Sequence, residues 1–86
     1  MATTYAQTTV TSAATSILVA ADSRRRLIFR NTGTVIVYIG QDNTVTTSIG
    51  YPIGVGQTFY LNDYKGAVYG IVSSTSGTLS VIEERI

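Results

Sequence analysis

The chain has 86 residues with a net charge of +1, only 13% of them are charged, and it has no cysteine and no histidine. This composition excludes disulfides, the usual zinc and copper ligands, and a strongly basic nucleic-acid-binding protein. A domain of this size buries only about 60% of the surface that its unfolded chain exposes. Small domains without disulfides or metals gain stability by association. We therefore expect a homo-oligomer or a domain that docks on a larger assembly.

Residues 1–16 carry no charged side chain and are rich in Thr, Ala and Ser. Their large apolar side chains after the first residue are Tyr5 and Val10. Because so little apolar surface can be buried, the sequence predicts an extended N-terminal arm, followed by a folded domain at residues 17–86. The arm has two interpretations: a frayed terminus, or a strand that becomes ordered by adding to a neighbouring subunit.

From residue 17 onward the chain consists of short strand-like runs separated by turns, and no segment has helical spacing of apolar residues. The runs are residues 17–20, 24–31, 35–39, 57–61, 67–73 and 78–83. Gly-containing turns at residues 31–34 and 74–77 predict two β-hairpins. The pattern indicates an all-β fold, either a small antiparallel β-sandwich or a jelly-roll-like barrel.

A long connection spans residues 40–56 and contains Pro52, the single proline of the chain. Proline lacks a backbone N–H, so it marks a turn or the approach to a sheet edge.

The run at residues 24–31 presents two different faces, since successive side chains of a strand alternate. One face carries the apolar Leu27 and Phe29. The other face carries, in a row, Arg24, Arg26, Ile28 and Arg30. This row is either a solvated charged face that discourages unwanted strand pairing or a docking stripe for acidic side chains, because guanidinium groups bind carboxylates bidentately.

The run at residues 35–39 is apolar on both faces, and Ile36 and Tyr38 lie on the face that one small sandwich does not need. Burial of the second face requires a partner, which again favours assembly. The candidate assembly residues are Tyr5, Val10, Arg24, Arg26, Ile28, Arg30, Ile36 and Tyr38.

The sequence predicts no enzyme and no cofactor. A Ser or Thr nucleophile has no His or Cys partner here. Glu83 and Glu84 are neighbours in a strand, so they point to opposite faces and form a poor pair for glycoside chemistry. We interpret this pair as part of a solvated terminus.

Two acidic turns and three tyrosines leave alternatives open. The turns at residues 41–43 and 62–63 offer oxygen ligands for Ca²⁺ but lack EF-hand spacing. Turn capping by Asn and Asp is therefore preferred, and no metal site is predicted. Tyr51, Tyr60 and Tyr64 suit either a carbohydrate platform or a protein interface.

Neither a signal-peptide pattern nor an apolar run of about 20 residues occurs in the chain. We expect no membrane contact and no nucleic-acid partner, and synthesis in a cytoplasm.

Four segments together look familiar: residues 25–40, residues 50–53 with Gly56, residues 66–71 and residues 78–84. In its turn glycines and strand hydrophobes this pattern resembles small β-sandwich virion proteins of tailed bacteriophages, over about residues 16–84. The family pattern marks fold positions and supplies no binding residues.

The resemblance implies a structural virion protein, most of all a capsid decoration or cement protein that binds the major capsid protein or other virion proteins. A trimer is the favoured homo-oligomer, and the place of action is the virion, after synthesis in the host cytoplasm. The alternatives are a head-fibre base, a head–tail connector or a tail component and, from a different class, a carbohydrate-binding β-sandwich module.

Overall fold

The computed structural model describes residues 2–22 and 24–85, which form eight β-strands and no helix. The strands are β1 (Ala2–Thr11), β2 (Thr15–Leu18), β3 (Arg24–Asn31), β4 (Val37–Gly40), β5 (Tyr51–Ile53), β6 (Thr58–Asn62), β7 (Val68–Ile71) and β8 (Ser76–Arg85). No helix that could cross a membrane is therefore present in the described ranges.

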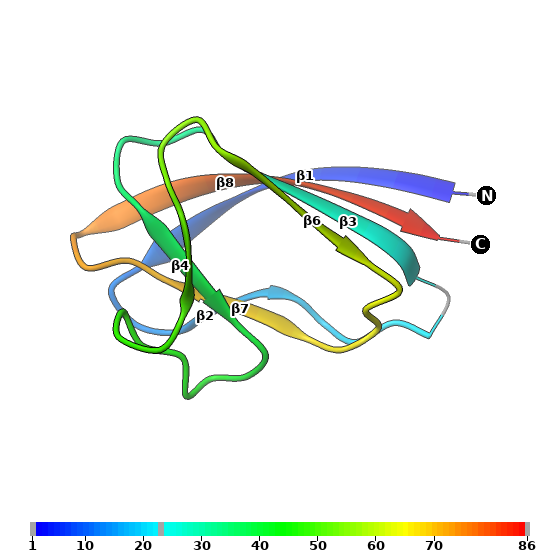
Figure 1. Ribbon diagram of the computed structural model, residues 1–86, viewed down its shortest axis with the longest axis horizontal. Helices are drawn as coiled ribbons and strands as arrows, with labels where there is room; N and C mark the ends of the chain where they lie inside the picture. The colour runs from blue at the N-terminus through cyan, green and yellow to red at the C-terminus, as the bar shows by residue number, and fades with distance from the viewer. Residues whose placement is uncertain (1, 23, 86) are drawn as a thin grey trace.

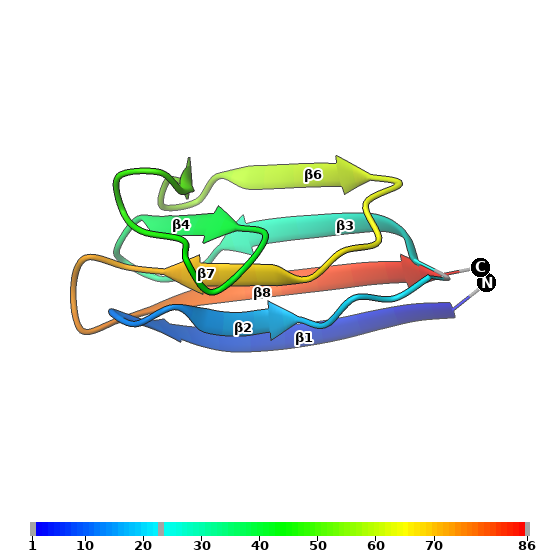
Figure 2. The same cartoon turned by 90° about the horizontal axis from the view of Figure 1, so that it is seen from below.

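The strands form two antiparallel sheets of four strands each (Figure 1). Sheet A has the order β1-β8-β3-β6, and sheet B has the order β2-β7-β4-β5. The two sheets stack face to face in a molecule of 36 × 24 × 16 Å (Figure 2). β1 and β8 run along its long axis, and β4 is steeply inclined to that axis (Figure 1). The predicted all-β antiparallel sandwich is confirmed.

The segment expected as an N-terminal arm is a strand of the sandwich itself. β1 pairs with β8 in an uninterrupted antiparallel register from Ala2↔Arg85 to Thr11↔Ser76. The expected boundary between residues 16 and 17 falls inside β2. Pairing along ten residues satisfies the backbone of this Thr-rich segment, and burial of Val10 ties its end to the core.

Both predicted hairpins are wrong. β3 lies in sheet A and β4 in sheet B, and likewise β7 lies in sheet B and β8 in sheet A. The short connections therefore carry the chain from one sheet to the other. The buried Asn31 holds the first of them, since its side-chain amide donates to the carbonyls of Val35 and Ile53, both at 2.8 Å.

The core lies between the sheets and is built from alternate residues of the strands. In β3 the inward side chains are Leu27 and Phe29, as the sequence predicts. The buried cluster is Val10, Leu27, Phe29, Val37, Ile39, Ile53, Val68, Val72, Leu79 and Val81. It is entirely aliphatic apart from one phenylalanine.

The connection between β4 and β5 folds back onto sheet B. Its Val45 is buried and packs against Gly40, where a Cβ atom would lie only 2.7 Å from the Val45 side chain. A Cβ atom added at Gly50 would likewise lie 2.7 Å from the Cβ atom of Tyr38. This connection therefore covers part of the outer face of sheet B with the chain's own residues.

Candidate assembly surfaces

The outer face of sheet A carries a continuous row of large side chains that crosses all four strands. Tyr5 is opposite Ile82, Ile82 is opposite Ile28, and Ile28 is opposite Tyr60. We name these four residues the apolar stripe. The two tyrosines at its ends are 74% and 58% exposed, and the two isoleucines between them are half-buried.

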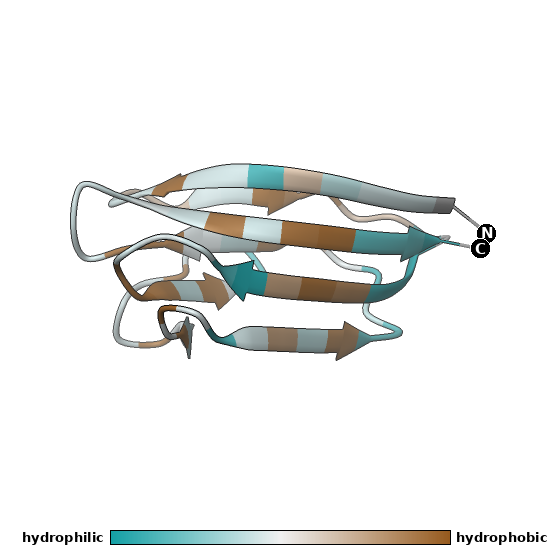
Figure 3. Ribbon diagram, turned by 90° about the horizontal axis from the view of Figure 1, so that it is seen from above, coloured by the Kyte–Doolittle hydropathy of each residue, from teal (hydrophilic) through white to brown (hydrophobic). Residues whose placement is uncertain are grey.

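Polar rows flank the apolar stripe on both sides. The row toward the chain termini is Thr3, Glu84, Arg26 and Asn62, and the row on the other side is Gln7, Ser80, Arg30 and Thr58. In the first row the Nε atom of Arg26 donates to Glu84 at 2.6 Å. Along the strands as a whole, counting residues of both faces, Figure 3 shows hydrophobic colour in the middle of β8 and β3 and hydrophilic colour where β8 ends and β3 begins.

Arg24 does not belong to the outer row in which the alternation of side chains places it. The register of β3 against β8 shifts between Arg24 and Arg26, so Arg25 is an extra residue. Such a bulge reverses the facing of the residue before it. Arg24 consequently points inward and is fully buried.

The buried Arg24 guanidinium has a complete set of partners. Its Nε atom donates to Glu83 at 2.7 Å, and its two terminal nitrogens donate to the carbonyls of Gly66 at 2.7 Å and Val19 at 2.6 Å. Glu83 is thus buried, which corrects its interpretation as part of a solvated terminus. Burial opposes ionisation of Glu83, but its hydrogen bonds and charge interactions with Arg24 and Arg85 outweigh burial and lower its pKa.

The eight candidate assembly residues therefore separate into three groups. Val10 and Arg24 are buried inside the chain. Tyr38 in β4 lies beside Gly50 of the connection that partly covers sheet B, and Ile36, just before β4, is exposed. The remaining four lie together on the outer face of sheet A, namely Tyr5, Arg26, Ile28 and Arg30. Sequence reasoning missed Ile82, because the alternation of one strand does not reveal which residue lies beside it on the next.

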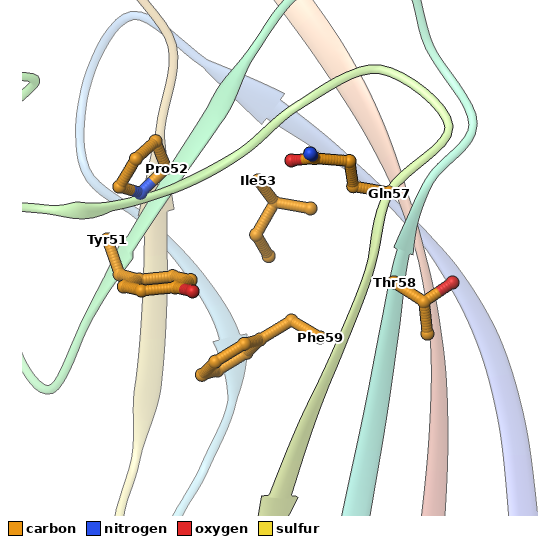
Figure 4. A pocket seen from close by; sticks show the side chains of 6 residues that line it. All are labelled: Tyr51, Pro52, Ile53, Gln57, Thr58 and Phe59. Carbon is orange, nitrogen blue, oxygen red and sulfur yellow. The ribbon is translucent and has the colours of Figure 1, made fainter.

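A shallow hollow of about 250 Å³ lies where β5 and β6 approach each other (Figure 4). Its lining residues are Tyr51, Pro52, Ile53, Gln57, Thr58 and Phe59. The rings of Tyr51 and Phe59 lie 4.5 Å apart between centroids. The lining has no carboxylate, lysine or arginine, so it offers contact area and no acid–base chemistry.

The three tyrosines of the supposed carbohydrate platform do not share a surface. Tyr51 and Tyr64 line a neighbouring hollow at the open side of the sandwich, whereas Tyr60 points outward from sheet A. Tyr64 also donates its hydroxyl to the Ala67 carbonyl at 2.7 Å. No joint platform for a sugar ring is formed.

The acidic turns have local structural roles. The carboxylate of Asp42 accepts hydrogen bonds from the hydroxyl and the backbone N–H of Thr44, and these bonds lower its pKa. Asp63 has a left-handed backbone with φ of 61°, which Asp tolerates in tight turns. Within residues 2–22 and 24–85, no three metal-ligating side chains gather in one place.

No protein-family model matches the chain, and no curated protein matches it in sequence. Among solved structures, the chain is similar to a protein of Bacillus endospore appendages, which form disulfide-linked pili. The TM-score is 0.60 at 14% identity, and the match covers 99% of this chain and 86% of that chain. At this identity the similarity establishes the shared sandwich fold.

This similarity corrects the resemblance to tailed-bacteriophage virion proteins. The protein that shares the sandwich along almost the whole chain belongs to bacterial spore appendages and not to a phage. The similarity also overturns the functions expected from the sequence: the decoration, head–tail and tail roles, the capsid partner, the location in a virion and the carbohydrate-binding module. Turn glycines and strand hydrophobes are required by any small sandwich, so they do not identify one family.

Proposed function

We propose that this protein is a non-enzymatic structural subunit that polymerises with copies of itself into a fibre. The observation that carries the proposal is the unprotected edge of β1. This strand pairs on one side only, runs for ten residues without a bulge, and contains no charged residue and no proline. Natural edge strands avoid aggregation through bulges, charged residues and proline. A long edge without any of these features is therefore suited to pairing with another chain.

The edges of sheet B make a clear contrast. β2 has four residues and an irregular register, and β5 has three residues that include Pro52. Both edges of sheet B are therefore short or interrupted, which disfavours strand addition. Growth is expected in the plane of sheet A.

The second edge of sheet A is β6, which is also uncharged. Pairing of β1 with β6 of the next copy is a head-to-tail contact, and such contacts generate open fibres when the rotation does not close. The pilus assembly of the structurally similar appendage protein supports this choice. We propose a fibre in place of the trimer that the resemblance to phage virion proteins implies.

The absence of cysteine distinguishes this chain from the disulfide-linked pili. Disulfides therefore cannot join its copies, and we propose non-covalent contacts, so the fibre should dissociate on dilution or in mild denaturant. Its strength would come from main-chain hydrogen bonds repeated at every joint.

The test is to place a lysine on the β1 edge. Ala6 is exposed and faces the sandwich side of β1, so in Ala6→Lys an added strand would cover and desolvate the new charge. Thr47→Lys, in the exposed connection after β4, is the control with the same charge. We expect fibres of wild type and control by electron microscopy, and at least a tenfold loss of sedimenting material for Ala6→Lys at unchanged circular dichroism. A wild type that stays monomeric, or an Ala6→Lys variant that polymerises normally, overturns the proposal.

A further inference from the structure

The outer face of sheet A is a second surface, independent of the β1 edge, and it has no covering segment among the described residues. The apolar stripe runs across it between two polar rows, whereas sheet B is partly covered by the connection after β4. Four strands at about 4.8 Å and eight residues at about 3.3 Å give roughly 500 Å² for this face. Two such faces would bury about 1,000 Å² in total, the lower limit of a specific interface.

We propose that this face binds the same face of a second copy, related by a twofold axis that runs parallel to the strands between β8 and β3. The inference goes beyond the proposed function, because the contact lies on a different surface and needs no fibre. In this arrangement β8 of each copy lies over β3 of the other. Ile82 then meets Ile28 of the second copy, and Tyr5 meets Tyr60 of the second copy. The apolar stripes of the two copies therefore cover each other.

The charges of the flanking row select this axis. With the axis parallel to the strands, Glu84 lies over Arg26 of the second copy and Arg26 lies over Glu84. These two contacts join the two internal ion pairs into a square of alternating charge. With the axis along the apolar stripe instead, Arg26 would lie over Arg30 of the second copy. Like charges at a dry interface are unfavourable, which excludes the second arrangement.

The row on the other side is compatible with the same axis. Arg30 lies over Ser80 of the second copy, and Gln7 lies over Thr58, so no two like charges meet. The ends of the apolar stripe place Tyr5 and Tyr60 in contact, and tyrosine is enriched at interfaces because it buries area while keeping a polar tip.

The test uses two variants of opposite charge. Arg26→Glu gives a face with two acidic residues in the row, and Glu84→Arg gives a face with two basic ones. Both side chains are partly exposed, so the fold should tolerate the changes. Each variant alone should dimerise at least tenfold more weakly than wild type, and an equimolar mixture should form a heterodimer at least as stable as the wild-type dimer. Native mass spectrometry separates the three species.

Lys65→Glu is the matched control, because it changes the net charge equally at an exposed residue of the connection between β6 and β7, outside the outer face of sheet A. We expect it to dimerise as wild type does. An Arg26→Glu variant that dimerises as tightly as wild type, or a mixture without heterodimer preference, overturns the proposed axis. A wild type that stays monomeric at millimolar concentration overturns the contact and leaves the apolar stripe to a partner of another sequence.

All measurements are repeated in the Ala6→Lys background, where fibre growth through β1 should be blocked. The dimer is expected to persist there. If the protein forms fibres but the mixture of charge variants shows no preference for the heterodimer, the face contact alone is refuted. If the dimer forms but the wild type never forms fibres, the fibre alone is refuted. An apolar variant adds a readout that does not depend on charge: Ile82→Thr should weaken the dimer tenfold, whereas Ile49→Thr in the exposed connection should not.

Discussion

A fully buried arginine holds the end of the sandwich where the two chain termini lie (Figure 1). Arg24 links β3 to β8 through Glu83, and it links both to the connections before β3 and before β7 through the carbonyls of Val19 and Gly66. A buried charge is tolerated only when such partners replace water. The buried side-chain nitrogen and oxygen atoms of the described residues all have hydrogen-bond partners.

Removing the carboxylate of Glu83 should strongly lower the free energy of unfolding. In Glu83→Gln the Arg24 charge stays buried without its counter-ion, and breaking a buried ion pair in this way costs about 3–5 kcal/mol. For a domain of this size each kcal/mol corresponds to roughly 4–8 °C in Tm, so we expect a fall of more than about 12 °C in thermal unfolding. Glu84→Gln breaks the exposed pair with Arg26 and should cost less than about 1 kcal/mol. Equal effects of the two variants would contradict the buried pair.

The same pair predicts a pH dependence of stability. The pKa of Glu83 is lowered in the folded chain, so the folded state holds the ionised form more strongly than the unfolded state does. Its contribution is therefore complete above the ordinary carboxyl pKa of about 4.3 and is lost as the pH falls through the lower folded pKa. Urea unfolding from neutral to acidic pH should show the free-energy difference between wild type and Glu83→Gln narrowing below about pH 4.3. A difference that stays constant would argue against this linkage.

At the scale of the strand, β1 is part of the folded domain and not an appendage of it. Its Val10 is completely buried among core residues, and its backbone pairs with β8 from end to end. Residues 2–11 have little apolar content of their own, so the order of this segment comes from the sheet that it joins. The strand therefore has two roles: it completes sheet A, and it presents the free edge for the proposed assembly.

Truncation of the buried valine distinguishes an integral strand from a loose arm. Val10→Ala removes two buried methyl groups and should destabilise the domain by about 2 kcal/mol, whereas Thr9→Ala on the exposed face should change stability by less than about 0.5 kcal/mol. Urea unfolding measures both. Hydrogen exchange should also protect β1 amides that face β8 nearly as well as those of β8. Equal, negligible effects of the two variants would show that β1 detaches in solution.

The sequence predicts the identity of most strands but not their partners. Residues 24–31 form β3 with the expected bounds, because the alternation of Leu27 and Phe29 is a local signal. The turn after β3 looks like a hairpin, yet Asn31 bonds to carbonyls of both Val35 and Ile53 and carries the chain to the other sheet. Pairing depends on residues far apart in sequence, and a local turn pattern does not contain that information.

The candidate site was predictable to a similar extent. The outward position of Ile28 and Arg26 follows from alternation within one strand. The apolar stripe requires the registers of three strand pairs, and the inward turn of Arg24 requires a one-residue bulge. The three-residue β5 escapes prediction because Pro52 and its short length give it no strand signal.

At the scale of the whole molecule, the two proposed contacts act in different directions. The β1 edge extends sheet A within its own plane, and the apolar stripe faces along the normal to that plane. A subunit with both contacts can build a fibre along one direction and pair two fibres along the other. Since one small core gives limited stability to an 86-residue chain, these contacts should also stabilise the fold of each subunit.

Thermal stability should therefore rise with protein concentration. A partner that binds only the folded chain stabilises it by mass action, by about 1.4 kcal/mol for each tenfold increase above Kd, or about 0.7 kcal/mol per chain when two chains share one contact. This corresponds to roughly 3–6 °C in Tm per tenfold increase, which calorimetry over about a hundredfold range can resolve. The double variant Ala6→Lys with Arg26→Glu should show a flat Tm, because it has lost both contacts while keeping the core. A wild-type Tm that does not change with concentration would mean that the subunit is complete by itself and that neither surface binds another copy.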